Sequence, residues 1–246
     1  PTSPKTTGSP LTGRSTAEVS YDRYAASVEA RFTDGLAKAV PTARTGVRLR
    51  AVYGGIAVRL PANQAKSLLA LPGVAAVHSD APQQPDEATV EAAEFMGSAG
   101  LWRYLGGQAN AGKGVILADL DTGVWPEHPF FADNPALGDP PAAPSGLPRA
   151  CDFGDNPLTA AADEFVCNRK LIGGRPFQDT HNANIPGDLY SDSARDADGH
   201  GTHTTSTAAG NVLTSAPIFG VDRGPISGVA PGAWILAYKV CGSGGC

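Results

Sequence analysis

The chain lacks long apolar runs and clusters of one charge. No segment reaches the roughly 18 consecutive apolar residues of a membrane-spanning helix. Its 19 basic and 24 acidic residues give a net charge of −5, and Lys and Arg form no block, so neither nucleic acid nor an anionic membrane is an expected partner. The chain begins PTSPKTTGSP, without Met or the apolar core of a signal peptide. We therefore expect that the original N-terminus was removed or lies upstream.

Cysteine is scarce, with Cys151, Cys167, Cys241 and Cys246 making up the four. They form no Cys-x-x-Cys pair and have no closely interleaved histidine, which disfavours a zinc site. We expect two disulfides, Cys151 with Cys167 and Cys241 with Cys246, because these partners are nearest in sequence. Disulfides would imply an oxidising location outside the cell.

The first third of the chain has the pattern of a small α+β unit. Residues 1–20 are rich in Ser, Thr, Pro and Gly and are expected to be flexible. Apolar residues recur every three or four positions over 21–36, which predicts an amphipathic helix. Alternation over 47–60 predicts a strand or hairpin bent at Gly54 and Gly55, followed by a short helix over 61–69 and a strand over 74–77. A polar linker follows.

The second part of the chain predicts an α/β fold. The near-continuous apolar runs at 114–120 and 233–240 predict parallel strands buried on both faces, with Asp121 at the end of the first. The segment from His200 predicts a helix that ends near Gly210. Residues 132–196 are expected to form a long irregular excursion pinned by the first disulfide. These elements predict a doubly wound parallel sheet with polar residues at its strand ends.

Two unrelated classes of protease use the triplet Asp-Thr-Gly that begins at Asp121. An aspartic protease brings two such triplets together so that two carboxylates share a proton. Residues 122–246 contain no second triplet, which argues against that class. A serine protease instead uses the Asp to orient a histidine that acts as a general base.

The second motif, GHGTH, places His200 and His203 at a helix start. The helix dipole disfavours imidazolium there, and an acid at one ring nitrogen would fix the tautomer, so we expect Asp121 to contact His200. Asp196 and Asp198 are expected to cap the helix. A metal site at the two histidines is disfavoured, because no carboxylate follows at a matching spacing.

These motifs resemble those of subtilisin-like serine proteases, most closely the plant-type subtilases and their bacterial relatives. VILADLDTGVWPEH resembles the catalytic-Asp segment and RDADGHGTHTTSTAAG the catalytic-His segment, while CNRKLIGGRPF and GVAPGAWILAYKVC extend the match. The resemblance implies that Asp121 is the relay acid and His200 the general base, with His203 and Asp198 structural. It implies a polypeptide substrate and neither a cofactor nor a catalytic metal, and the sequence does not address calcium.

The resemblance also covers the chain on both sides of these motifs. The segment from YGGIAVRL to VAAVHSD resembles an inhibitor-type propeptide, a ferredoxin-like module that caps the active site of its own enzyme until it is cleaved. It implies a flexible segment 1–20, a propeptide 21–84 and the N-terminal part of a peptidase domain 85–246, with the maturation cut near 80–87. Gly242, Ser243 and Gly244 correspond to the rim that pairs with extended substrate as an added strand.

The chain departs from the family in lacking Gly-Thr-Ser, which carries the nucleophile. It also lacks the family's opening Tyr-Ile-Val strand. We therefore interpret the chain as a fragment of a secreted serine endopeptidase zymogen that is inactive without its Ser. The alternative is a non-catalytic pseudoprotease or a propeptide-like protein that binds proteases.

Another departure is Asp119, at a position where the family has an apolar residue. Positions two apart on a strand share a face, so its carboxylate is expected to point the same way as that of Asp121. We expect burial and like-charge repulsion to raise the pKa of one of the pair and to shift the acid limb of activity upward. The alternative is a hydrogen-bonded, inert Asp119.

Overall fold

The structure, a computed structural model, describes residues 15–50, 54–80, 97–159, 163–184, 190, 192–242 and 245–246. The chain divides into two compact units, one formed by described residues up to Asp80 and the other by most of those from Gly97 onward. No helix in these ranges is long and apolar enough to cross a membrane.

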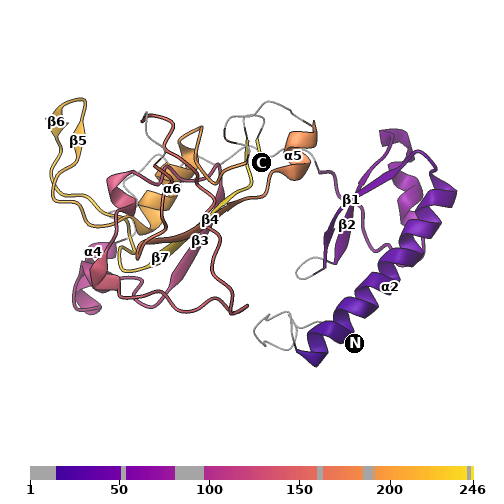
Figure 1. Cartoon of the computed structure of the whole chain (residues 1–246), viewed down its shortest axis with the longest axis horizontal. Coiled ribbons are helices and arrows are strands. Elements are labelled where there is room, and N and C mark those ends of the chain that lie inside the picture. The colour runs from indigo at the N-terminus through magenta and orange to yellow at the C-terminus, as the bar shows by residue number, and fades with distance from the viewer. Residues whose placement is uncertain are drawn as a thin grey trace. The chain divides into compact units, whose positions relative to one another are not determined.

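The first unit is built on one long helix (Figure 1). Its elements are α2 (Thr16–Ala39), β1 (Arg44–Leu49), β2 (Gly55–Arg59) and the 3₁₀ helix η1 (Ala62–Ala70). The two strands pair antiparallel. Leu36 and Val40 from the end of α2 and Leu68 from η1 form a small buried core with Val58 and Leu60 packed against it.

Helix α2 begins earlier than the sequence pattern predicted. Ser15 Oγ accepts a hydrogen bond from Glu18 N, and the Glu18 carboxylate accepts one from Ser15 N, which is a complete capping box. The expectation that residues 1–20 are flexible was therefore wrong for residues 15–20, and residues 1–14 lie outside the described residues. The apolar periodicity that predicts this helix starts only at Tyr21. It cannot reveal the first turn of α2, because that turn is largely exposed.

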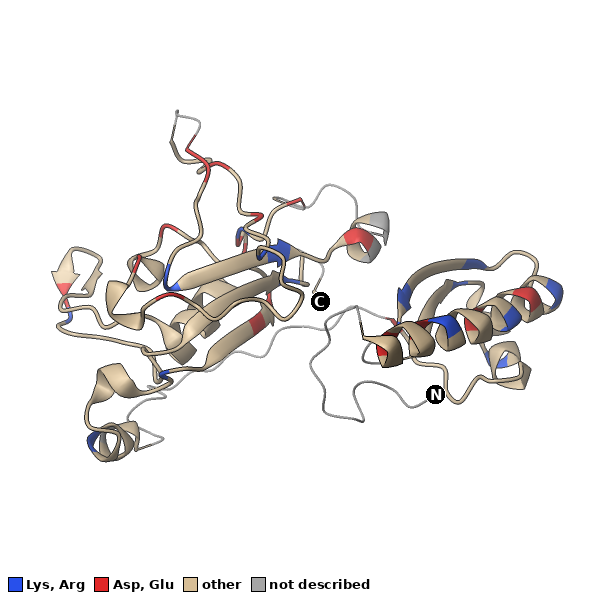
Figure 2. Ribbon diagram, turned by 60° about the horizontal axis from the view of Figure 1, so that its bottom comes forward, with Lys and Arg blue, Asp and Glu red and all other residues tan. Residues whose placement is uncertain are grey.

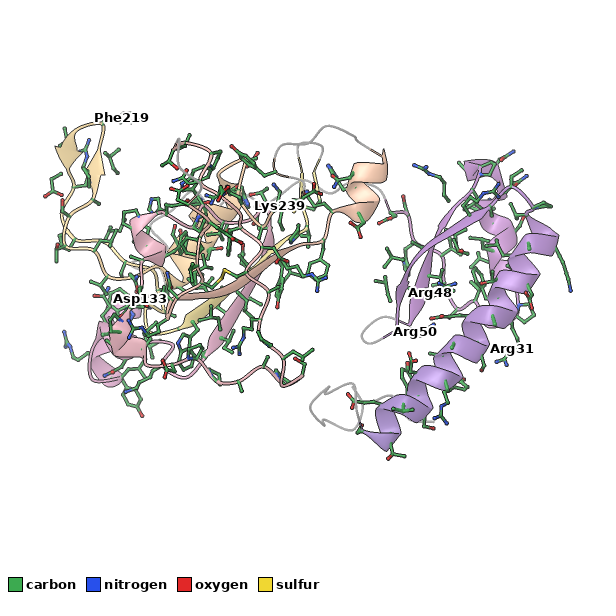
Figure 3. All side chains as sticks on the ribbon, in the orientation of Figure 1. Arg31, Arg48, Arg50, Asp133, Phe219 and Lys239 are labelled. Atoms are coloured by element: carbon green, nitrogen blue, oxygen red, sulfur yellow. A yellow bond between two sulfur atoms is a disulfide. The ribbon has the colours of Figure 1, made fainter. Side chains whose placement is uncertain are left out.

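Acidic and basic residues are interspersed along α2 (Figure 2). Two of the acidic residues pair with arginines of strand β1 or of the turn after it. Arg50 donates two hydrogen bonds to the Glu29 carboxylate, at 2.8 and 2.6 Å, and one to Asp22 at 2.8 Å. Arg48 also lies 3.2 Å from Glu29. Both arginines are labelled in Figure 3. The Arg50 hydrogen bond is the main reason that the pKa of Glu29 is lowered.

The predicted strand over 74–77 does not form. Residues 74–80 are irregular, and the side chain of Val77 is largely exposed. A strand needs a neighbour that accepts and donates its ladder hydrogen bonds, and β1 and β2 pair only with each other in the described part of this unit. Tyr53, expected in the preceding hairpin, lies outside the described residues.

The second unit contains a three-stranded parallel sheet and is an α/β fold, as predicted. The sheet has the order β3-β7-β4, with β3 (Ile116–Asp121), β7 (Trp234–Lys239) and β4 (Leu171–Pro176). The remaining elements are α4 (Ser98–Tyr104), η2 (Gln108–Asn110), η3 (Pro129–Phe131), η4 (Pro135–Leu137), α5 (Asp179–Asn184), α6 (His200–Ala209), β5 (Pro217–Ile218) and β6 (Val221–Asp222).

One face of this sheet packs on the core and supports α6. Register pairs Asp119 with Ala237 and Asp121 with Lys239, so these residues share that face, where Ile235 and Ala237 are fully buried. On the opposite face Leu120 is 65% exposed. We predicted that β3 is buried on both faces, and among the described residues this is wrong. Strand β3 lies at the edge of the sheet, and one of its faces is largely exposed.

Strand β4 lies within the excursion that the sequence led us to expect as irregular. Its Gly173 and Gly174 lower its strand propensity, yet the packing requires them. A Cβ at Gly174 would overlap the Phe153 ring, and one at Gly173 would press on the Ala150 carbonyl oxygen. The predicted disulfide between Cys151 and Cys167 is confirmed.

A buried lysine joins the ends of the core strands. The Lys170 side chain is fully buried, and its Nζ donates to the carbonyl oxygens of Pro231 at 2.8 Å and Ala233 at 2.7 Å. Burial disfavours the ammonium form and lowers the pKa of Lys170 from 10.5 to about 8.

We expect the stability of the wild type relative to Lys170→Met to rise between pH 8 and 10.5. In this window the folded chain has lost the Lys170 proton while the unfolded chain retains it, so increasing pH favours folding. The rise should be about 1–3 kcal/mol in the free energy of unfolding, measured by denaturant titration across the pH series. Lys113→Met, at an exposed lysine, is the control. If the Lys170 and Lys113 variants change in parallel, the buried ammonium does not have a lowered pKa.

Candidate active site

Asp121 is the last residue of β3, and the sheet fixes its backbone. Its carbonyl oxygen accepts hydrogen bonds from Val240 N at 2.8 Å and Cys241 N at 3.1 Å, just after β7. Its Oδ1 accepts a hydrogen bond from Thr122 N at 2.6 Å. The carboxylate is thus held at the carboxyl end of a parallel sheet, the edge at which α/β proteins place their sites.

His200 begins α6 and meets this carboxylate. Its Nδ1 lies 2.8 Å from each Asp121 carboxylate oxygen, and the Thr204 hydroxyl donates to Oδ2 at 3.2 Å. The His200 and Asp121 side chains are only 10% and 13% exposed. A carboxylate at Nδ1 holds the ring with its proton on that atom, which leaves Nε2 as the nitrogen that accepts a proton. The pair can therefore act as an oriented general base.

The two segments approach so closely that only glycine fits between them. A Cβ on Gly201 would overlap the Gly123 carbonyl oxygen, and one on Gly123 would overlap the Ala194 carbonyl oxygen. Val124 N donates to Ala194 O at 3.0 Å, and Asp196 N donates to Val124 O at 3.2 Å. Backbone hydrogen bonds thus join the stretch after Asp121 to the stretch before His200.

An ion pair between a buried arginine and a partly exposed glutamate, not predicted from the sequence, joins the same two stretches. Arg195 is 1% exposed and makes two hydrogen bonds to Glu127, at 2.6 and 2.9 Å. Its guanidinium also lies 5.0 Å from the centre of the Trp125 ring and donates to the carbonyl oxygens of Phe153 and Gly154. The signal in the sequence was an acid after the first motif and an arginine before the second, a pattern too common to interpret alone.

Asp119 lies on the same face of β3 as Asp121. Burial, and to a smaller extent the charge of Asp121, raise the pKa of Asp119 from 3.8 to about 6. Thr205 of α6 partly opposes this rise by favouring the ionised carboxylate, although its buried hydroxyl makes no well-aligned hydrogen bond. We give more weight to burial, because it does not depend on the orientation of a hydroxyl.

The other predicted site residues lie at varying distances from the pair. His203 is on α6 with an exposed side chain. Asp198 is also exposed, and its Oδ1 accepts a hydrogen bond from His200 N at 3.2 Å, in keeping with a cap. Gly242 pairs with Gly245 inside the loop closed by the confirmed disulfide between Cys241 and Cys246. Ser243 and Gly244 lie outside the described residues.

Nothing in the described ranges groups three His, Cys, Asp or Glu side chains in a way that could hold a metal ion.

A profile described as "Subtilase family" matches residues 112–246, which include the whole site. The chain belongs to the subtilase family. This subtilase is 40% identical over 206 residues to Subtilisin-like protease SBT1.4 of Arabidopsis thaliana, covering 80% of the chain and 24% of that relative. It is 39% identical to SBT1.7 of the same plant, covering 78% and 24% of the two chains, and 44% identical to SBT5.3 over a shorter segment, 60% and 17%. The chain thus spans about a quarter or less of these relatives' length.

We expect Gly201→Ala to destabilise the second unit of the subtilase by about 1–3 kcal/mol, because the new methyl group must push the Gly123 backbone away. Thermal and denaturant unfolding would measure the loss. Gly100→Ala is the matched control, since a Cβ there meets nothing within 4 Å and the residue lies in helix α4. Equal stability of the two variants would contradict the close backbone approach.

We expect Asp119→Asn to gain stability relative to the wild type as pH rises from about 4 to 6. In that window the folded wild type retains the Asp119 proton and the unfolded chain has lost it, so rising pH disfavours the wild-type fold. The amide side chain of the variant does not titrate, so the variant does not lose stability in this pH range. Free energies of unfolding over the pH series would test it, with exposed Asp139→Asn as control. Parallel curves for the wild type and Asp119→Asn would refute the raised pKa.

Proposed function

We propose that this subtilase is the N-terminal part of a serine endopeptidase zymogen that cleaves polypeptides by acyl transfer. The observation that carries the proposal is the contact between His200 Nδ1 and the Asp121 carboxylate, 2.8 Å at both oxygens, in a mostly buried setting. Membership of the subtilase family supports it further.

In the proposed reaction, His200 Nε2 takes the hydroxyl proton of a serine as its oxygen attacks the substrate carbonyl carbon. Asp121 stabilises the imidazolium that forms. His200 then gives the proton to the leaving amine, and a water molecule hydrolyses the acyl-enzyme by the same route in reverse. The serine is not in this chain, which has no Gly-Thr-Ser. The chain by itself is therefore expected to be inactive.

The proposal includes the first unit as a ferredoxin-like, inhibitory propeptide. Its buried core, formed by the end of α2 and by η1 with Val58 of β2 packed against it, is separate from that of the second unit, which supports a removable module. Extended substrate would pair as an added strand at the rim that includes Gly242. Two disulfides and the absence of free cysteine in the described residues favour a secreted protein.

The test uses the protein expressed from the complete gene. We expect it to cleave peptides and to react with a fluorophosphonate at one serine. Asp121→Asn should lower kcat by about 10⁴-fold, because the imidazole loses the partner that fixes its tautomer. Asp133→Asn is the control, since Asp133 pairs with Arg169 at the surface outside the site. A wild type with neither labelling nor cleavage would refute the proposal.

The competing proposal is a non-catalytic pseudoprotease or a propeptide-like protein that binds other proteases. A gene with no serine nucleophile, together with tight binding to an active subtilisin-like protease, would favour it. The buried Asp121–His200 pair argues the other way, since binding alone does not require it.

A further inference from the structure

Asp196 is a buried carboxylate that no role described so far explains in full. It is 4% exposed. Its Oδ1 accepts hydrogen bonds from the Thr122 hydroxyl, Asp198 N and Gly199 N, each at 2.9 Å. Its Oδ2 accepts from Thr202 N at 2.9 Å and from the Thr202 hydroxyl at 2.6 Å. Five donors thus converge on one small group.

These donors come from both halves of the site. Thr122 directly follows Asp121, whereas Gly199 and Thr202 lie on either side of His200. The two hydroxyls extend the connection, because Thr122 Oγ1 also accepts from Gly201 N at 2.8 Å. Thr202 Oγ1 in turn accepts from Trp125 N at 2.9 Å. The Asp196 carboxylate therefore bridges the end of β3 and the start of α6.

The arrangement suits a carboxylate, because each of the five hydrogen bonds to its two oxygens comes from a donor. An amide would turn its own NH₂ group toward one set of these donors. The positive end of α6 and the two hydroxyls compensate the buried charge. A helix cap would need only the contacts to α6. The Thr122 contact is the additional feature, because it sets where Asp121 lies relative to His200.

We propose that Asp196 is a positioning residue that keeps the Asp121 carboxylate aligned with His200 Nδ1 and so holds the imidazole in its Nδ1–H tautomer. This inference rests on the proposed function for its purpose. Its test does not, because the tautomer can be observed without catalysis.

The experiment measures the ¹⁵N chemical shifts of the His200 ring in the ¹⁵N-histidine-labelled chain, at a pH where the ring is neutral. His200→Gln assigns the signal among the 5 histidines. We expect the wild type to be mainly Nδ1–H, and Asp196→Asn to shift a large fraction to Nε2–H. Thr122→Val keeps the Asp196 carboxylate and removes the hydroxyl that joins it to the end of β3, together with the hydrogen bond which that hydroxyl accepts from Gly201 N, so it should shift the tautomer in the same direction.

Asp222→Asn is the matched control. Asp222 also accepts hydrogen bonds from backbone N–H groups, those of Ala216 and Gly224. It lies in the β5–β6 hairpin, whose tip carries Phe219 (Figure 3). Its variant should lose local stability without changing the His200 tautomer.

An unchanged tautomer in folded Asp196→Asn would overturn the proposal and leave Asp196 as a helix cap. If that variant does not fold, an unchanged tautomer in Thr122→Val overturns it equally. A wild type that is mainly Nε2–H also overturns it, since Asp121 would then not hold the ring. If the shift occurs in a protein from the complete gene that neither cleaves peptides nor reacts with fluorophosphonate, the proposed function fails and the positioning role stands.

Discussion

The second unit depends on a backbone approach that leaves no room for side chains. Gly123 and Gly201 bring the chain after β3 against the first turn of α6, and Asp121 and His200 meet beside this close approach. Once the backbones are this close, the polar groups between them cannot be reached by much water and must satisfy one another. The hydrogen bonds of Val124 and the ion pair of Arg195 with Glu127 meet this requirement. Removing Glu127 would leave the buried Arg195 guanidinium without its carboxylate partner and so destabilise the second unit.

Buried cations tie the same junction to the sheet. Lys239 of β7 (labelled in Figure 3) is 1% exposed, and its Nζ donates to Arg195 O at 2.9 Å and Tyr190 O at 3.3 Å. It stands opposite Asp121 in the parallel register. The central strand therefore holds the acid through backbone pairing and holds the segment before His200 through a lysine. This gives a physical reason for charged residues at the end of an otherwise apolar strand.

The sequence predicted the contact between Asp121 and His200, both disulfide pairings and the strands β3 and β7, because each depends on local patterns that survive folding. Strand β4 was not predicted, because its Gly173 and Gly174 are unfavourable in a strand pattern. These glycines leave room for the Ala150 carbonyl oxygen and the Phe153 ring, and those contacts exist only in the folded chain. The predicted strand over 74–77 failed for the opposite reason, since apolar residues without a pairing partner do not make a strand. Arg195 and Glu127 are 68 positions apart in the sequence, and no local sequence pattern predicts such a contact.

The disulfide between Cys151 and Cys167 encloses a loop in which two apolar side chains face solvent, with Leu158 78% exposed and Val166 80% exposed. Exposed irregular segments of this kind are where proteases cut most readily. A single cut inside this loop would not release either piece, because the sulfur bridge spans it and both flanks remain packed in the second unit. A chain cut in this loop would therefore still run as one full-length band on a non-reducing gel. Only after reduction does the apparent mass report whether the main chain is intact.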